Sequence, residues 1–122
     1  MNIDKIRKQF LSKQETDERT TLLLKMILSV CSPHRVIVFG SAARYELTTA
    51  SDVDVVVVFS NLDEMKSAKK TLHAKCGELN FPVDFILVDM QTYEVKSLIG
   101  GALFDARVEG RVLFEGDCIC EL

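Results

Sequence analysis

The sequence of 122 residues has no excess of basic residues and no long apolar run. Its 15 Lys and Arg against 18 Asp and Glu give a net charge of −3. Duplex DNA and anionic membranes favour proteins with clustered positive charge, so we expect neither as a strong partner. The longest apolar run, residues 55–59, is far shorter than the roughly 20 residues of a membrane-spanning helix.

Signals for export and for zinc binding are also missing. The N-terminal stretch MNIDKIRKQF carries charges where a signal peptide has its apolar centre, so we expect a cytoplasmic protein. Cys31, Cys76, Cys118 and Cys120 do not form the two spaced pairs of a zinc site, which favours ordinary reduced thiols. With 48% hydrophobic and 27% charged residues, the chain is typical of a globular protein, and we expect one domain over residues 1–122.

The first third of the chain predicts helices followed by a strand. Apolar residues at helical spacing predict a helix over residues 3–14 and another over 22–30, with a bend in the polar stretch 12–21. Pro33 ends this helical segment, residues 1–32, because proline cannot continue a helix. The β-branched run 35–39 predicts a strand.

Strands and helices alternate in the rest of the chain. Residues 42–47 are compatible with a short helix, and the valine-rich run 52–60 predicts a strand buried on both faces. A helix over 63–77 follows, capped by Asp63 or Asn61 and ended by Gly77. A strand over 83–88, a helix capped by Asp89 that extends to residue 103, and a short strand at 111–115 complete the pattern. The sequence therefore predicts an α/β (α+β) fold, a small mixed sheet flanked by helices.

An Asp-Val-Asp motif stands at the head of the valine-rich strand. Side chains two residues apart on a strand share a face, about 6.6 Å apart along it, so Asp52 and Asp54 point the same way. Two adjacent carboxylates repel each other, and a divalent cation such as Mg²⁺ relieves the repulsion. Taken alone, the motif has a simpler interpretation, in which Asp52 caps a turn and Asp54 is solvated at a strand end.

Two further features point to phosphate and metal chemistry. Gly40-Ser41 ends a strand where glycine permits close approach of a ligand, and a helix beginning at the serine would present free amides to an anion. Asp84 lies within an apolar strand, an unusual position for a carboxylate unless it is paired or bound to a metal.

Together these residues resemble a known family. The stretch GSAARYELTTASDVDVVVVF, in which residues 42–51 separate Ser41 from Asp52, resembles the motif of the DNA polymerase β nucleotidyltransferase superfamily. VDFIL around Asp84 is similar to the strand that carries the third carboxylate of that superfamily. The chain resembles in particular the minimal nucleotidyltransferases of bacteria and archaea. The resemblance covers residues 35–115, the expected catalytic core, and implies the nucleotidyltransferase fold.

The resemblance implies a role for each motif residue. Asp52 and Asp54 would hold the nucleotide-associated metal and share a second one, and Asp84 would complete the second site and help to activate the attacking hydroxyl. Gly40 and Ser41 would hold the outer phosphates. The implied cofactors are two Mg²⁺ ions, with Mn²⁺ as an alternative, in a two-metal displacement.

Three further polar residues lie in or next to the motif segments. Arg44 matches an arginine of the family motif and is expected to neutralise triphosphate charge, with a solvated helix arginine as the alternative. Tyr45 stands where the family commonly has glycine, which leaves the shape of the loop open. Asp89 points away from Asp84 on a regular strand and is expected to cap a helix.

The resemblance predicts an enzyme that transfers a nucleoside monophosphate, AMP from ATP, to an acceptor hydroxyl. In the minimal family the acceptor is in some cases a tyrosine of a small helical HEPN toxin, for which the nucleotidyltransferase serves as antitoxin. The alternative is a non-catalytic nucleotide-binding or antitoxin module that acts by protein contact. The nucleoside base, the acceptor and a homodimeric state stay open at this point.

Overall fold

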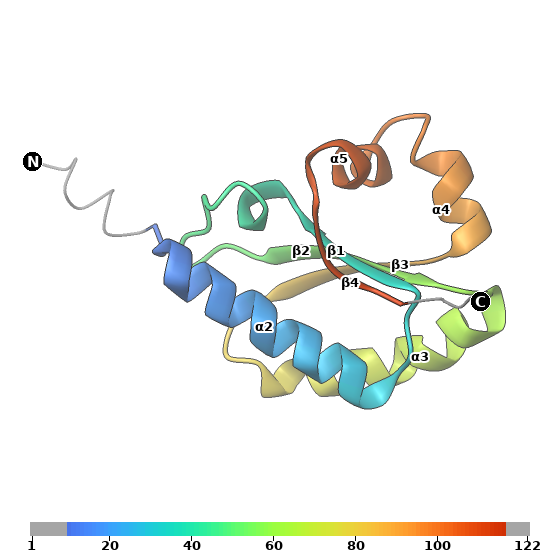
Figure 1. Ribbon diagram of the computed structural model, residues 1–122. Helices are drawn as coiled ribbons and strands as arrows, with labels where there is room; N and C mark the ends of the chain where they lie inside the picture. The colour runs from blue at the N-terminus through green and yellow to red at the C-terminus, as the bar shows by residue number, and fades with distance from the viewer. Residues whose placement is uncertain (1–9, 117–122) are drawn as a thin grey trace, which may run out of the picture.

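The chain forms one four-stranded mixed sheet. The computed structural model describes residues 10–116. Strands β1 (Arg35–Phe39), β2 (Val53–Phe59), β3 (Val83–Asp89) and β4 (Arg111–Glu115) lie in the order β3-β2-β1-β4. β1 runs antiparallel to both β2 and β4, whereas β2 and β3 are parallel (Figure 1). The predicted mixed sheet and α/β class are confirmed.

Helices cover both faces of this sheet (Figure 1). Helices α2 (Lys13–Val30) and α3 (Leu62–Lys75) pack on one face, and α4 (Met90–Lys96) and α5 (Ala102–Glu109) pack on the other. The alternate valines of β2 belong to two different buried clusters, one on each face. Burial on both faces explains why β2 is an almost continuous run of valine.

The N-terminal helix differs from its prediction. α2 begins at Lys13 and continues to Val30 without a bend, so the bend expected over residues 12–21 is wrong. Ser12 is the N-cap: its hydroxyl accepts from the Glu15 amide at 3.0 Å, and the Glu15 carboxylate accepts from the Ser12 amide at 2.8 Å. This capping box starts the helix inside the stretch that was expected to interrupt it. Most of the helix predicted over residues 3–14 lies outside the described residues.

The other helices follow their predicted starts more closely than their predicted ends. Asn61, not Asp63, caps α3 by accepting from the Glu64 amide at 2.9 Å. α3 ends at Lys75, two residues before the predicted stop, and a short 3-10 turn η2 (Cys76–Glu78) follows.

Asp89 caps α4 as predicted, through bonds to the Thr92 amide and hydroxyl at 3.3 and 2.6 Å. α4 ends at Lys96, however, so the single helix predicted to reach residue 103 is wrong. Gly100 and Gly101 adopt φ angles of 138° and 82°, which a right-handed helix excludes, and α5 begins after them.

Candidate active site

The strongest feature of the site is a pair of aspartates on neighbouring parallel strands. Asp54 in β2 lies directly opposite Asp84 in β3. Neighbouring strands are about 4.8 Å apart, and residues in register on parallel strands present their side chains on the same face. Asp54 is half-buried and Asp84 is exposed. The sheet register therefore brings together two carboxylates from separate segments of the chain.

Asp52 extends this pair to a group of three. It lies just before β2 and is exposed to solvent. Burial raises the pKa of Asp54 above its ordinary value, and the negative charges of Asp84 and of Asp52 raise this pKa further, in that order. Both neighbours are thus close enough to repel the ionised Asp54. Without a cation, the group is electrostatically crowded.

The Gly40-Ser41 turn lies against the same carboxylates. Phe39, the last residue of β1, pairs with Asp54, and Gly40 follows with φ at 63°. A Cβ atom at position 40 would lie 2.8 Å from Asp54 Oδ2. Glycine is therefore required here both by the backbone conformation and by the closeness of Asp54.

The loop after Gly40 contains less helix than predicted. Only a single 3-10 turn, η1 (Gly40–Ala42), forms, and residues 43–45 continue as a turn. The Glu46 amide donates to the Ser41 carbonyl at 2.8 Å, which folds the loop back on itself. The helix expected over residues 42–47 is thus wrong, and the anion-favouring dipole of a longer helix is missing from this turn. The absence of a side chain at Gly40 instead lets the Asp54 carboxylate lie directly against the turn.

Arg44 is exposed and already paired. Its guanidinium contacts Glu46 at 2.9 Å and Glu109 of α5 at 3.2 Å. These two carboxylates, Glu46 first, raise the pKa of Arg44 further. Exposed ion pairs of this kind contribute little to stability, so they can exchange for a more highly charged ligand at small cost.

The carboxylates suit a metal site that is completed by a nucleotide better than a site formed by protein ligands alone. Among residues 10–116, no group of three or more His, Cys, Asp or Glu residues is arranged to hold a metal ion by itself. Mg²⁺ in nucleotide sites, however, is held by one or two carboxylates together with phosphate oxygens and water. The in-register pair Asp54 and Asp84, with Asp52 beside it, matches this donor set. The residues fit a metal that arrives with a nucleotide.

The raised pKa of Asp54 gives a first testable prediction. A carboxylate with a raised folded-state pKa stabilises the fold below its unfolded pKa, and this contribution is lost as pH rises through the folded value. We expect metal-free wild-type protein to lose stability relative to Asp54→Asn as the pH rises from below the ordinary pKa of an aspartate to above the raised pKa of Asp54. Urea unfolding of both proteins across this range measures the difference in their free energies of unfolding. The contributions of the other carboxylates largely cancel in this difference because both proteins contain them. Parallel stability curves would contradict the crowding of Asp54.

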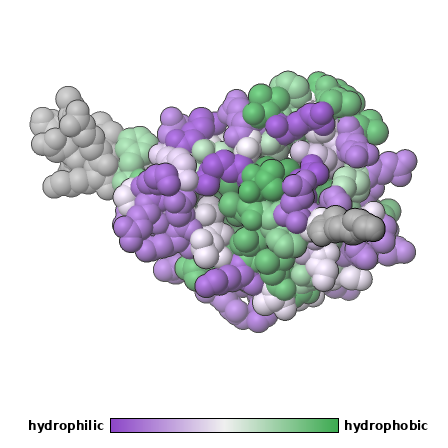
Figure 2. Space-filling view, in the orientation of Figure 1, coloured by the Kyte–Doolittle hydropathy of each residue, from purple (hydrophilic) through white to green (hydrophobic). Residues whose placement is uncertain are grey.

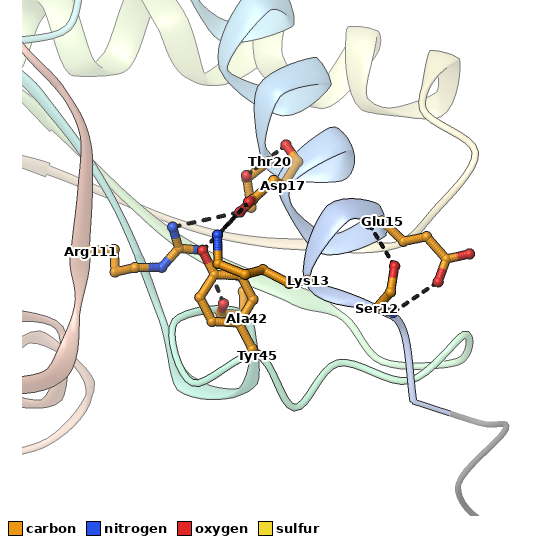
Figure 3. A network of polar contacts seen from close by, with 8 residues as sticks. All are labelled: Ser12, Lys13, Glu15, Asp17, Thr20, Ala42, Tyr45 and Arg111. Carbon is orange, nitrogen blue, oxygen red and sulfur yellow. Dashed lines mark hydrogen bonds and ion pairs between the residues drawn. The ribbon is translucent and has the colours of Figure 1, made fainter.

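A second group of residues, which supports the loop, could not be predicted from the sequence. Lys13 and Asp17 of α2 and Arg111 of β4 surround Tyr45 (Figure 3). The Tyr45–Asp17 bond joins residues 28 positions apart, and the bond from Arg111 to the Ala42 carbonyl joins residues 69 apart. No local motif spans such separations. The unusual tyrosine at position 45 was the one visible signal.

Comparison with known proteins identifies a family and a similar fold. The family model described as "Nucleotidyltransferase domain" matches residues 23–109. No curated protein matches the sequence. A candidate nucleotidyltransferase from Sulfolobus solfataricus has a similar fold, with a TM-score of 0.52 and 16% identity over 84% of this chain and 83% of its own. A mutant of the toxin–antitoxin complex MntA–HpeT gives a TM-score of 0.53 and 18% identity over 87% of this chain and 75% of its own.

Within residues 10–116, none of the helices has both the length and the apolar character that crossing a bilayer requires.

Proposed function

Because the chain belongs to the nucleotidyltransferase domain family, we propose that it is an enzyme that transfers a nucleoside monophosphate, AMP from ATP, to an acceptor hydroxyl. The observation that carries this proposal is the register of β2 and β3, which sets Asp54 opposite Asp84, while the pairing of β1 with β2 places Gly40 beside Asp54. Crowded carboxylates next to a turn that allows close approach are suited to a metal–triphosphate complex.

Each site residue has a role in the proposed reaction. Asp52 and Asp54 would hold the metal that accompanies the triphosphate, and Gly40 and Ser41 would receive the outer phosphates. Asp84 would complete the second metal position and accept the proton of the acceptor hydroxyl. The hydroxyl oxygen forms a bond to the α-phosphorus, the bond from this phosphorus to its bridging oxygen breaks, and pyrophosphate leaves. Two Mg²⁺ ions, when bound, supply charge stabilisation at the attacking and leaving oxygens.

We further propose that the acceptor is a hydroxyl of a partner protein, a tyrosine of a small helical HEPN-type toxin. The similarity in fold to a protein of a toxin–antitoxin complex supports this choice. So does an apolar surface formed by α4, α5 and the start of β4, part of which is visible as green side chains over α5 in Figure 2. Exposed apolar side chains on neighbouring elements favour contact with another protein. The exposed large hydrophobic side chains of this surface are Val95, Leu98, Ile99, Phe104, Val108 and Val112.

A second candidate function is neutralisation of a partner by contact alone, with the nucleotide site serving no reaction. The observation that favours it is the same apolar surface, which suits a partner protein whether or not a reaction takes place. The three aspartates and the tight packing of Gly40 against Asp54 favour the enzyme.

The binding step gives a second prediction. ATP should bind at least about tenfold more weakly when a chelator removes divalent cations, because the carboxylates then repel the triphosphate. Isothermal titration calorimetry with ATP, in Mg²⁺ and then in EDTA, measures this difference. Equal affinities in the two buffers would show that no metal bridges the carboxylates to the nucleotide.

A further inference from the structure

Tyr45 adopts a backbone conformation that side chains other than glycine rarely take. Its φ angle is 59°, and no other non-glycine residue among residues 10–116 has a positive φ. The family resemblance places glycine here, and the structure retains a glycine-like turn despite the side chain. A bulky residue in this conformation is held there by its surroundings.

The side chain of Tyr45 is held by three charged residues from two other elements (Figure 3). Its hydroxyl donates to Asp17 Oδ1 at 2.9 Å. Arg111 Cζ lies 4.5 Å from the centre of the ring, and Lys13 Nζ lies 5.1 Å from it. Both cations are within the range of attraction to an aromatic ring. The ring therefore links α2 to β4.

Arg111 also contacts the loop that begins with Gly40. Its Nη2 donates to the Ala42 carbonyl at 3.2 Å, and its Nη1 lies 3.9 Å from Asp17 Oδ1. Ala42 is fully buried and is the last residue of η1, directly after Ser41. The ring of Tyr45 and the carboxylate of Asp17 thus orient the guanidinium that fixes η1.

The far end of the loop is fixed independently. Leu47 is fully buried, and its carbonyl accepts from the Leu11 amide at 2.8 Å. Between these two anchors, the positive φ of Tyr45 turns the chain so that the Glu46 amide returns to the Ser41 carbonyl. Tyr45 is therefore the point at which the loop that begins with Gly40 is held against the body of the protein.

We infer that Tyr45 is a positioning residue for the Gly40-Ser41 turn and acts through Arg111 on the affinity for the nucleotide triphosphate. The inference rests on the proposed nucleotide site. The role assigned to Tyr45 is to keep the turn in the conformation that would receive the phosphates, without a contact of its own to the substrate. Small displacements of positioning groups are sufficient to weaken such sites.

Three variants test the inference. Tyr45→Gly keeps the positive φ without strain and removes every side-chain contact. Arg111→Gln leaves Tyr45 in place and removes the guanidinium that donates to Ala42. Tyr45→Phe keeps the ring and removes the bond to Asp17. ATP affinity in Mg²⁺ is measured by calorimetry and folding by thermal unfolding, for each variant and for the double variant Tyr45→Gly, Arg111→Gln.

We expect Tyr45→Gly and Arg111→Gln each to weaken binding of Mg²⁺–ATP about tenfold, and the double variant to be little weaker than either, since both act through one contact. Tyr45→Phe should lose about twofold, less than Tyr45→Gly. If Tyr45→Gly is poorly folded, the other two variants still test the inference. It then requires that Arg111→Gln weaken ATP binding about tenfold and that Tyr45→Phe weaken it about twofold.

Two results would overturn the inference: folded single variants that bind ATP as wild type does, or losses that simply add in the double variant. Failure of wild type itself to bind Mg²⁺–ATP would instead refute the proposed function. The two failures are therefore distinguishable.

Discussion

Replacement of Asp54 by asparagine should lower nucleotidyl transfer by at least about a hundredfold while the protein stays folded. The asparagine side chain would keep the size of the aspartate but supply no charged ligand to the metal. The raised pKa of Asp54 shows that its charge opposes folding when no metal is present. Removal of that charge should therefore raise the melting temperature of the metal-free protein or leave it unchanged.

Asp89 provides the matched control for this experiment. It lies at the other end of β3, where it pairs with Phe59, and it caps α4. Asp89→Ala should retain transfer but lose about 1 kcal/mol of stability, the usual cost of removing a helix cap. Asp54→Asn should therefore lose transfer and keep its stability, whereas Asp89→Ala should keep transfer and lose stability. Transfer by Asp54→Asn within a few-fold of wild type would remove Asp54 from the proposed mechanism.

Gly40→Ala should damage both the nucleotide site and the fold. The φ angle of 63° disfavours any side chain, and the new Cβ would lie 2.8 Å from Asp54 Oδ2. Asp54 would have to move, and the turn would lose its close approach to a phosphate. We expect a loss of about 1–2 kcal/mol in unfolding free energy and ATP binding at least about tenfold weaker.

Gly77→Ala is the control for the glycine substitution. No heavy atom lies within 4 Å of a Cβ added at Gly77, and its φ angle is not in the positive region. Its stability should change by less than about 0.5 kcal/mol, and its ATP affinity should not change. Urea unfolding and calorimetry of both variants make the comparison. If Gly40→Ala behaves like Gly77→Ala, the turn is not part of the site.

The strands of this fold were predictable because local sequence determines them. β1, β2 and β3 are β-branched apolar runs bounded by polar residues, and their observed bounds differ little from the predicted ones. Helix ends were less predictable. The capping box at Ser12 is present in the sequence, but the polar character of residues 12–21 favoured a bend there. The pair Gly100 and Gly101 is present too, but the apolar spacing up to residue 103 favoured one continuous helix.

The sequence indicated the candidate site residues but not the strand register that brings two of them together. The spacing of the motif pointed to Asp52 and Asp54, and the position within an apolar strand pointed to Asp84, whereas the register that sets Asp54 opposite Asp84 depends on how two separate strands pair. The hydrogen bond and the two cation contacts of the Tyr45 side chain come from residues of α2 and β4. Such long-range contacts leave no periodic or motif signal in the sequence.

The central claim is transfer of a nucleoside monophosphate, and the position of the transferred phosphorus tests it most directly. The protein and a small helical HEPN-type partner are incubated with Mg²⁺ and ATP labelled at either the α- or the γ-phosphorus. We predict that α-label becomes attached to the partner, that γ-label leaves in pyrophosphate, and that Asp54→Asn transfers neither while still binding the partner. Neutralisation of the partner without attachment of either label would contradict the claim and favour a module that acts by contact.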